Sequence, residues 1–307
     1  MAMARPFPMG GSSSLLGRVP APTTSTRRPS SCVSVMAPHT ATLRPGVEGR
    51  TDQVSSLFRN NRAPARVPTG MQVDIFSDVV CPWCAVGKRR FEEALRRFEH
   101  ADEIDVVWRA YELDPGAPVR REGDYADRLA KKYGMTREQA VTANERLTAT
   151  AANEGLEFHF ERAQPGNTFD AHRLLHYARE SGRQDALKER LFLAYFTEGA
   201  PIGDPETLVA LAAEVGLDRE ESAAILAGDR YADEVRADER QALEIGVTGV
   251  PFFVVDGKFG IPGAQDADTI LSVLQRAWAK AHPLVMVEAP NATTSEGAVC
   301  EGDTCAI

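Results

Sequence analysis

The chain has few cysteines, no long apolar run and no excess of positive charge. Five of its 307 residues are cysteine, too few for a small secreted scaffold built on disulfides. No stretch approaches the ~18 consecutive apolar residues of a membrane-spanning helix. The net charge of −9 argues against a nucleic-acid-binding protein, which would show a basic face. What is present, 43% hydrophobic and 26% charged residues, is typical of a globular protein of one large or two small domains.

The first 70 residues differ from the rest in charge and composition. They hold nine Arg, no Lys, one Asp and one Glu, which leaves 26 basic and 42 acidic residues, a net charge of −16, for residues 71–307. Because the segment is rich in Arg, Ser and Pro and lacks a hydrophobic period, we expect residues 1–70 to be a disordered leader. A transit peptide has this composition. We favour an upstream extension before a start at Met71, and a cytoplasmic protein.

Hydrophobic periodicity predicts a short sheet covered by helices. Alternating apolar residues, or β-branched and aromatic ones, mark four strands, at residues 71–77, 104–113, 252–255 and 259–261. Apolar residues at helical spacing predict one helix after the first strand, at 85–99, and a closing helix at 266–280. The turn Asp256-Gly257 joins the last two strands into a hairpin.

The middle of the chain, residues 123–246, shows helical patterns only, with breaks for six or seven helices. The element order is therefore β-α-β, a helical block, then β-β-α, which predicts an α/β fold interrupted by an all-helical insertion domain. We expect residues 71–122 and 247–280 to form the α/β domain in two parts. Residues 281–307 are expected to be a flexible tail.

The motif Cys81-Pro-Trp-Cys84 lies where the first strand turns into a helix. The start of a helix offers unpaired N–H groups and about half a positive charge, which stabilise a thiolate. Two cysteines at this spacing can form a disulfide, with the first thiolate attacking and the second resolving a mixed disulfide. Because Cys81 precedes the helix and Cys84 lies on its core-facing stripe, we expect Cys81 to be exposed and partly ionised and Cys84 to be shielded. The alternative is half of a zinc site.

A second motif, Thr248-Gly-Val-Pro-Phe-Phe253, places a proline at the mouth of a strand. The bond before proline is the one type in which a cis peptide is cheap. Such a turn can hold a backbone edge beside a dithiol and present it to a peptide, so Val250 and Pro251 are candidate substrate-binding residues. The alternative is an ordinary proline at a strand entry.

Four segments in this order, residues 77–95, 108–115, 167–178 and 246–265, resemble the DsbA-like thioredoxin-fold oxidoreductases, and most of all their FrnE-like branch. The resemblance runs from Met71 to about Trp278. It implies a thioredoxin-like domain with a helical insertion, a nucleophile at Cys81, a resolving thiol at Cys84 and a cis proline at Pro251.

The function implied is a thiol:disulfide oxidoreductase without cofactor or metal. Its partners would be cysteine-containing proteins or low-molecular-weight thiols and a recycling thiol system, with no nucleic acid or membrane partner. Two other functions stay open. Glutathione-dependent isomerases of the kappa or chromene-carboxylate type, or a polyketide-tailoring isomerase, share the inserted-helix architecture, although they usually carry Ser where Cys81 stands. A zinc-stabilised binding module without catalysis is the other.

Further candidates carry less specific signals. Cys300 and Cys305 flank a short turn that a disulfide can span, and FrnE-like proteins sometimes carry such a tail, which implies an auxiliary redox pair; a shared zinc ion or no role are the alternatives. A flexible tail of this length spans roughly 25 Å and can reach Cys81. Trp83 is expected either to contact substrate or to shield the disulfide. In the resemblance, Asn167 and His172 fall on the helix that faces the dithiol and line the substrate.

Overall fold

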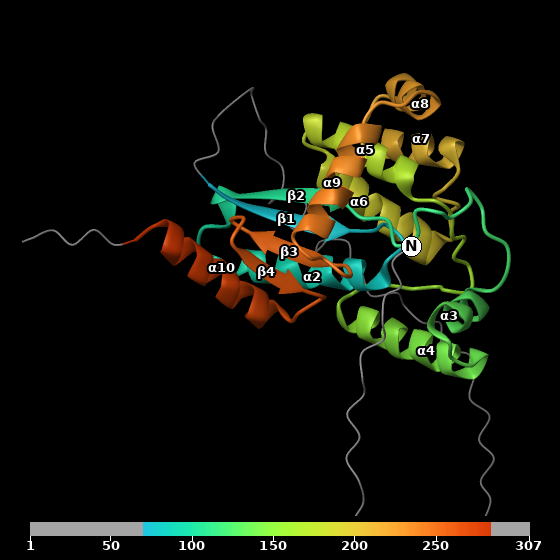
Figure 1. Cartoon of the computed structure of the whole chain (residues 1–307), viewed down its shortest axis with the longest axis horizontal. Helices are drawn as coiled ribbons and strands as arrows, with labels where there is room; N and C mark the ends of the chain where they lie inside the picture. The colour runs from blue at the N-terminus through green and yellow to red at the C-terminus, as the bar shows by residue number, and fades with distance from the viewer. Residues whose placement is uncertain (1–69, 284–307) are drawn as a thin grey trace, which may run out of the picture. The chain divides into compact units, whose positions relative to one another are not determined.

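Residues 70–283 of the chain are described by the computed structural model. Four strands form one mixed sheet in the order β2-β1-β3-β4 (Figure 1). The strands are β1 (Met71–Ser77), β2 (Ile104–Ala110), β3 (Phe252–Val255) and β4 (Phe259–Pro262). β1 pairs in parallel with β2 and antiparallel with β3, and β3 pairs antiparallel with β4. The central position of β1 agrees with its nearly continuous burial.

Two helices cover one face of the sheet. Helix α2 (Pro82–Arg96) connects β1 to β2, and α10 (Ala267–Ala281) follows β4 and packs against α2 (Figure 1). A 3-10 turn, Ala101–Glu103, leads into β2. The apolar stripes of the two helices and the strand residues facing them form one buried cluster, in which the rings of Phe91 and Phe253 stack with centroids 5.7 Å apart. The two halves of the α/β unit therefore share one core.

Every residue between β2 and β3 is described, and this segment forms seven α-helices. They are α3 (Tyr125–Tyr133), α4 (Arg137–Asn153), α5 (Phe169–Glu180), α6 (Gln184–Leu193), α7 (Pro205–Glu214), α8 (Arg219–Ala227) and α9 (Ala232–Glu244). A π-helical segment, Ala194–Glu198, continues α6. Successive strand residues point to opposite faces: Ile75 faces the cluster under α2 and α10, whereas Phe76 packs with Ala242 of α9. Helices thus cover both faces of the sheet.

A buried charge network joins α2 to α6. Lys88 of α2 forms ion pairs with Glu92 of its own helix and with Asp185 and Glu189 of α6, the last two at 3.3 and 3.2 Å from Nζ. The indole of Trp108 donates to Asp185 at 3.0 Å. Removing one partner from such a network leaves an uncompensated buried charge, which typically costs about 3–5 kcal/mol. The network therefore fixes α6 firmly against α2 and β2.

Most element boundaries agree with the predictions from periodicity. The ranges of β1 and β3 are confirmed, but β2 ends at Ala110 and not at Leu113. The reason is that the N–H of Leu113 donates to the carboxylate of Asp78, at 2.7 Å, and not to a strand. Helix α2 starts earlier than predicted, because Pro82 at its first position is compatible with a helix start.

None of the helices in residues 70–283 is long and apolar enough to cross a membrane. The predicted leader and the cysteine pair Cys300 and Cys305 lie outside the described residues. The domain boundaries at 122/123 and 246/247 stay predictions.

Gly87 allows α2 to approach the loop before β3. A Cβ added at Gly87 would lie 2.8 Å from Cγ of Pro251, closer than real Cβ atoms come. At an open helix position Gly→Ala stabilises by about 0.5–1 kcal/mol. We predict instead that Gly87→Ala lowers the free energy of unfolding by ~1–3 kcal/mol, the usual cost of overpacking. Chemical denaturation of the full chain measures the change.

Gly116→Ala is the matched control, because the Cβ added there meets only Asp114, at an ordinary 3.7 Å. We expect it to change stability by less than ~0.5 kcal/mol. A Gly87→Ala protein that is more stable than the wild type would contradict the predicted clash between the added Cβ and Pro251.

Candidate active site

The two cysteines lie at the start of α2. Cys81 is the residue before the helix, with extended backbone angles, and Pro82 occupies the first helical position. The N–H of Cys84 donates to the backbone carbonyl of Cys81 at 3.0 Å. Both thiols are free, and each one shifts the pKa of the other. The helix start thus brings the two sulfurs together, as the spacing predicted.

The prediction that Cys81 is exposed is wrong for this structure. Only 5% of the Cys81 surface is exposed, and none of the Cys84 surface. The Cys81 thiol donates to the carbonyl oxygen of Val250 at 3.6 Å, and Cys81 belongs to an apolar cluster against which Tyr125 packs. At this end of α2 it is Trp83 that is exposed, with 45% of its surface accessible to solvent.

The loop before β3 meets the dithiol. Its Val250–Pro251 peptide bond is cis. The carbonyl of Pro251 accepts from the N–H of Gly263, at 2.8 Å, whereas the carbonyl of Val250 faces the Cys81 thiol. The structure therefore brings together Cys81, Cys84, Val250 and Pro251, four of the predicted site residues.

A polar cluster lies buried beside the thiols. It consists of Ser77, Asp78, His172 of α5 and Lys188 of α6, each at most 1% exposed. Nζ of Lys188 donates to the carbonyl of Ser77 at 3.3 Å, and Nε2 of His172 lies 3.5 Å from Oδ1 of Asp78. Lys188 was missed in the sequence. The sequence hints at a buried Lys188 only because this charged residue lies between Leu187 and Leu191, which are both buried.

Burial and mutual contacts set the charges of this cluster. Burial opposes the charge of Asp78, but the contact with His172 and the N–H of Leu113 lower its pKa overall. Burial also lowers the pKa of His172, which favours the neutral imidazole. The pKa of Lys188 falls to about 8 because of burial, although the neighbouring Cys84 and Asp78 oppose that fall.

The surroundings shift the pKa values of the two thiols in opposite directions. Burial opposes ionisation of Cys84, but the hydrogen bond from the Cys81 thiol, the charge of Lys188 and the hydroxyl of Ser77 lower its pKa. The same hydrogen bond, followed by burial, raises the pKa of Cys81. Because each thiol acts on the other, the two titrate as a pair.

Asn167 and His172, predicted to line the substrate, make internal contacts here. Asn167 lies just before α5, and its side-chain oxygen accepts from the N–H of Phe169 at 2.9 Å. His172 is 1% exposed, so the prediction of a lining surface is wrong for it in this conformation. No three His, Cys, Asp or Glu side chains within residues 70–283 are arranged to hold a metal ion.

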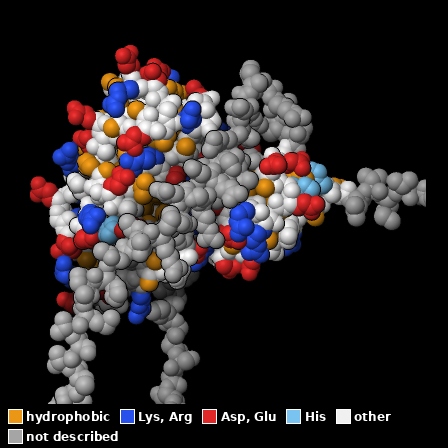
Figure 2. All heavy atoms as spheres, turned by 180° about the vertical axis from the view of Figure 1, so that it is seen from behind, with side chains coloured by type: hydrophobic (Ala, Val, Ile, Leu, Met, Phe, Trp, Pro, Cys, Tyr) orange, Lys and Arg blue, Asp and Glu red, His pale blue; other side chains and the backbone are white. Residues whose placement is uncertain are grey.

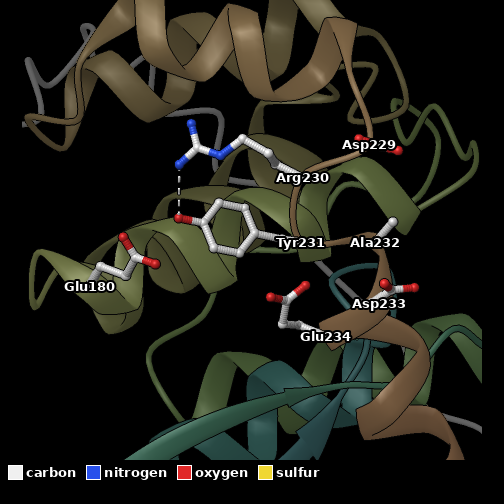
Figure 3. A pocket seen from close by; sticks show the side chains of 7 residues that line it. All are labelled: Glu180, Asp229, Arg230, Tyr231, Ala232, Asp233 and Glu234. Carbon is white, nitrogen blue, oxygen red and sulfur yellow. Dashed lines mark hydrogen bonds between the residues drawn. The ribbon is translucent and has the colours of Figure 1, made fainter.

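Two cavities lie on the insertion helices. One, of about 570 Å³, lies between α3 and α4 and is lined in part by Tyr125, Phe158 and Phe160. These three aromatic residues belong to, or pack against, the apolar cluster that contains Cys81. The other, of about 440 Å³, lies between Glu180 and residues 229–234 (Figure 3), and no predicted site residue lines it.

Acidic and basic side chains occur side by side on the face seen in Figure 2. Acidic side chains on this face therefore lie next to basic ones, in agreement with the ion pairs that Arg side chains form with Asp and Glu.

Comparison with known proteins agrees with this geometry. The family model of the DSBA-like thioredoxin domain matches residues 72–275. The crystal structure of a probable DsbA oxidoreductase from Streptomyces coelicolor is 46% identical, covers 76% of this chain and 100% of its own, and superposes with a TM-score of 0.67. The uncharacterized protein YwbO of Bacillus subtilis is 32% identical over 200 residues, 64% of this chain and 92% of YwbO.

The matched region includes the sheet, the insertion helices, both cysteines and Pro251, so the predicted α/β fold with a helical insertion is confirmed. The chain belongs to the DSBA-like thioredoxin domain family of oxidoreductases.

Proposed function

We propose that this protein is a thiol:disulfide oxidoreductase in which Cys81 exchanges disulfides with cysteine-containing proteins or small thiols and Cys84 resolves the mixed disulfide. The observation that carries the proposal is the position of the Cys81 thiol, between the start of α2, the Cys84 thiol and the carbonyl of Val250. A recycling thiol system returns the pair to its starting redox state.

The reaction starts with a proton transfer inside the pair. When Cys84 is in its thiolate form, it takes the proton of the Cys81 thiol, and Cys81 becomes the thiolate. It attacks a substrate disulfide, forms a bond to one substrate sulfur, and releases the other as a thiolate that takes a proton from water. Cys84 then gives its proton to water and attacks the sulfur of Cys81, which releases the second substrate thiolate and leaves the Cys81–Cys84 disulfide.

Two electrons pass to the substrate in this sequence, and its reverse oxidises substrate thiols. Since a thiolate and not a thiol is the nucleophile, each step needs one negative charge on the attacking sulfur. The environment of Cys84 supplies that charge at neutral pH more readily than an isolated thiol would.

Substrate contacts are proposed at three places around Cys81. The Val250 carbonyl lies at the sulfur and offers a backbone edge. Trp83 presents an exposed aromatic ring one residue before Cys84. The cavity at Tyr125 adds an apolar surface beside the same cluster.

We predict that Cys81→Ser reduces insulin no faster than the uncatalysed background, because no thiolate remains to attack. Cys84→Ser is expected to accumulate a mixed disulfide at Cys81, detected by mass spectrometry of the intact protein. Both variants are compared in a Cys300→Ser, Cys305→Ser background, so that the tail cannot resolve the intermediate. Cys32→Ser is the control and keeps the full rate. Turnover at the normal rate by Cys81→Ser would exclude the mechanism.

Trp83→Ala is predicted to lower kcat/KM for a protein disulfide substrate about fivefold or more, the usual effect of removing an aromatic contact worth over 1 kcal/mol. For a small disulfide such as hydroxyethyl disulfide the rate should stay the same, since the thiols are unchanged. Leu193→Ala is the control, because Leu193 of α6 is equally exposed, at 45%. An equal loss with both substrates would show that Trp83 acts on the thiols and not on the substrate.

A further inference from the structure

Lys188 is a buried cation at the carboxyl end of β1, the strand that leads into the two cysteines. It lies on α6, is 0% exposed, and donates to the carbonyl of Ser77, the last residue of β1, at 3.3 Å. Its ammonium also lies over the rings of Trp108 and Phe192, 5.4 and 5.1 Å from their centroids. Burying an ammonium is costly unless other charges compensate it.

No ion pair within 4.0 Å compensates Lys188 among the residues that the structure describes. Lys88, equally buried, differs in this respect, because three carboxylates surround it. Burial opposes the charge of Lys88, yet Asp185, Glu92 and Glu189 raise its pKa above the ordinary value. The pKa of Lys188 is lowered by burial to about 8, and the groups that oppose this fall are Cys84, Asp78 and Cys81.

We propose that Lys188 is a positioning residue that stabilises the thiolate of Cys84 and thereby sets how readily Cys84 resolves the mixed disulfide. This inference rests on the proposed function. If Lys188 has this role, helix α6 of the insertion contributes a residue to the chemistry of the cysteines.

The role of Lys188 is greatest in the mixed disulfide. There the sulfur of Cys81 is bonded to substrate and has no proton to donate, so Cys84 loses that hydrogen bond. The positive charge of Lys188, the hydroxyl of Ser77 and the backbone of Asp78 still lower its pKa. Cys84 releases its proton to water and attacks Cys81, the bond between Cys81 and substrate breaks, and the substrate sulfur leaves with the electron pair and takes a proton from water.

Other titratable groups also face this site. The negative charge of Asp78, just after β1, raises the pKa of Cys81, whereas its backbone lowers that of Cys84, and burial lowers the pKa of His172 of α5. The remaining groups that act on the thiols, on Lys188 or on Asp78 are Lys88 of α2, Tyr111 after β2, Tyr125 of α3 and Tyr195 after α6. The charge of Lys188 is among the largest effects that lower the pKa of Cys84.

The test isolates the Cys84 thiol in the full chain, with Ser in place of Cys32, Cys81, Cys300 and Cys305. Ultraviolet absorbance of the thiolate is followed against pH. Lys188→Met, which keeps the volume and removes the charge, should raise the titration midpoint of Cys84 by ~1–3 pH units, the usual effect of removing a close opposite charge. An unchanged midpoint overturns the proposal.

Gln184→Met is the matched control. Gln184 lies one turn earlier on α6, is also buried, and pairs with both backbone groups of Trp108 at 3.0 and 2.9 Å. Its replacement loosens the packing of α6 but keeps the charge of Lys188, so the titration midpoint of Cys84 should move much less than it does in Lys188→Met. If Gln184→Met moves the midpoint as far as Lys188→Met does, the effect comes from packing, and the proposal is wrong.

The rate of resolution gives a second readout. A raised pKa reduces the thiolate fraction tenfold per pH unit but increases nucleophilicity about threefold, so release of substrate from Cys81 at neutral pH should slow only ~3-fold per unit. At a pH above both midpoints Lys188→Met should resolve as fast as the wild type or faster. A slowing that is independent of pH overturns the proposal.

A measurement on the unaltered lysine covers the case in which Lys188→Met fails to fold. Coupling between two sites is reciprocal, so loss of the Cys84 thiolate must lower the pKa of Lys188. NMR titration of the labelled lysine side chains should therefore show a lower Lys188 midpoint in Cys84→Ser than in the reduced wild type. Equal midpoints overturn the proposal. Because none of these titrations needs turnover, they stand apart from the insulin assay, which tests the proposed function itself.

Discussion

The attachment of helix α6 to the sheet is the constraint on which the electrostatics of the site depend. Gln184 binds both backbone groups of Trp108 in β2, and Asp185 accepts from the indole of the same residue. An α-helix repeats every 3.6 residues, so Lys188 lies one turn beyond Gln184, on the same side of α6. These contacts place its ammonium at the carboxyl end of β1, where the chain turns toward the cysteines.

Two lysines with equal burial serve different purposes in this fold. Lys88 is held by carboxylates of α2 and α6, and its ion pairs join the α/β core to the insertion. Lys188 has no such carboxylate within ion-pair distance among the described residues, and its charge is balanced across a longer distance by Asp78 and the thiols. A network of close pairs stabilises packing, whereas a cation with distant partners responds to any change in the charge of the thiols. Redox state therefore bears directly on Lys188 and only weakly on Lys88.

Local patterns in the sequence predicted the sheet, the helix that follows the first strand and the hairpin at Asp256, because each depends on neighbours along the chain. The approach of Val250 and Pro251 to the cysteines followed from the resemblance. The burial of Cys81 could not be predicted in this way, because Tyr125 and Val250, which pack against its cluster, are far from it in sequence. The contact between Asp78 and His172, and the place of Lys188, depend equally on how α5 and α6 pack, which periodicity does not specify.

The distribution of charge between the two sulfurs follows from where the buried charges lie. A helix start alone favours a thiolate at Cys81, and the N–H of Cys84 does lower the pKa of that thiol. Asp78 opposes this effect at Cys81, while Lys188 and Ser77 act on Cys84. Since Asp78 stays ionised through its contacts with His172 and the N–H of Leu113, its negative charge and the positive charge of Lys188 polarise the pair in the same direction. Asp78 and Lys188 therefore both favour negative charge on the resolving sulfur over the attacking one.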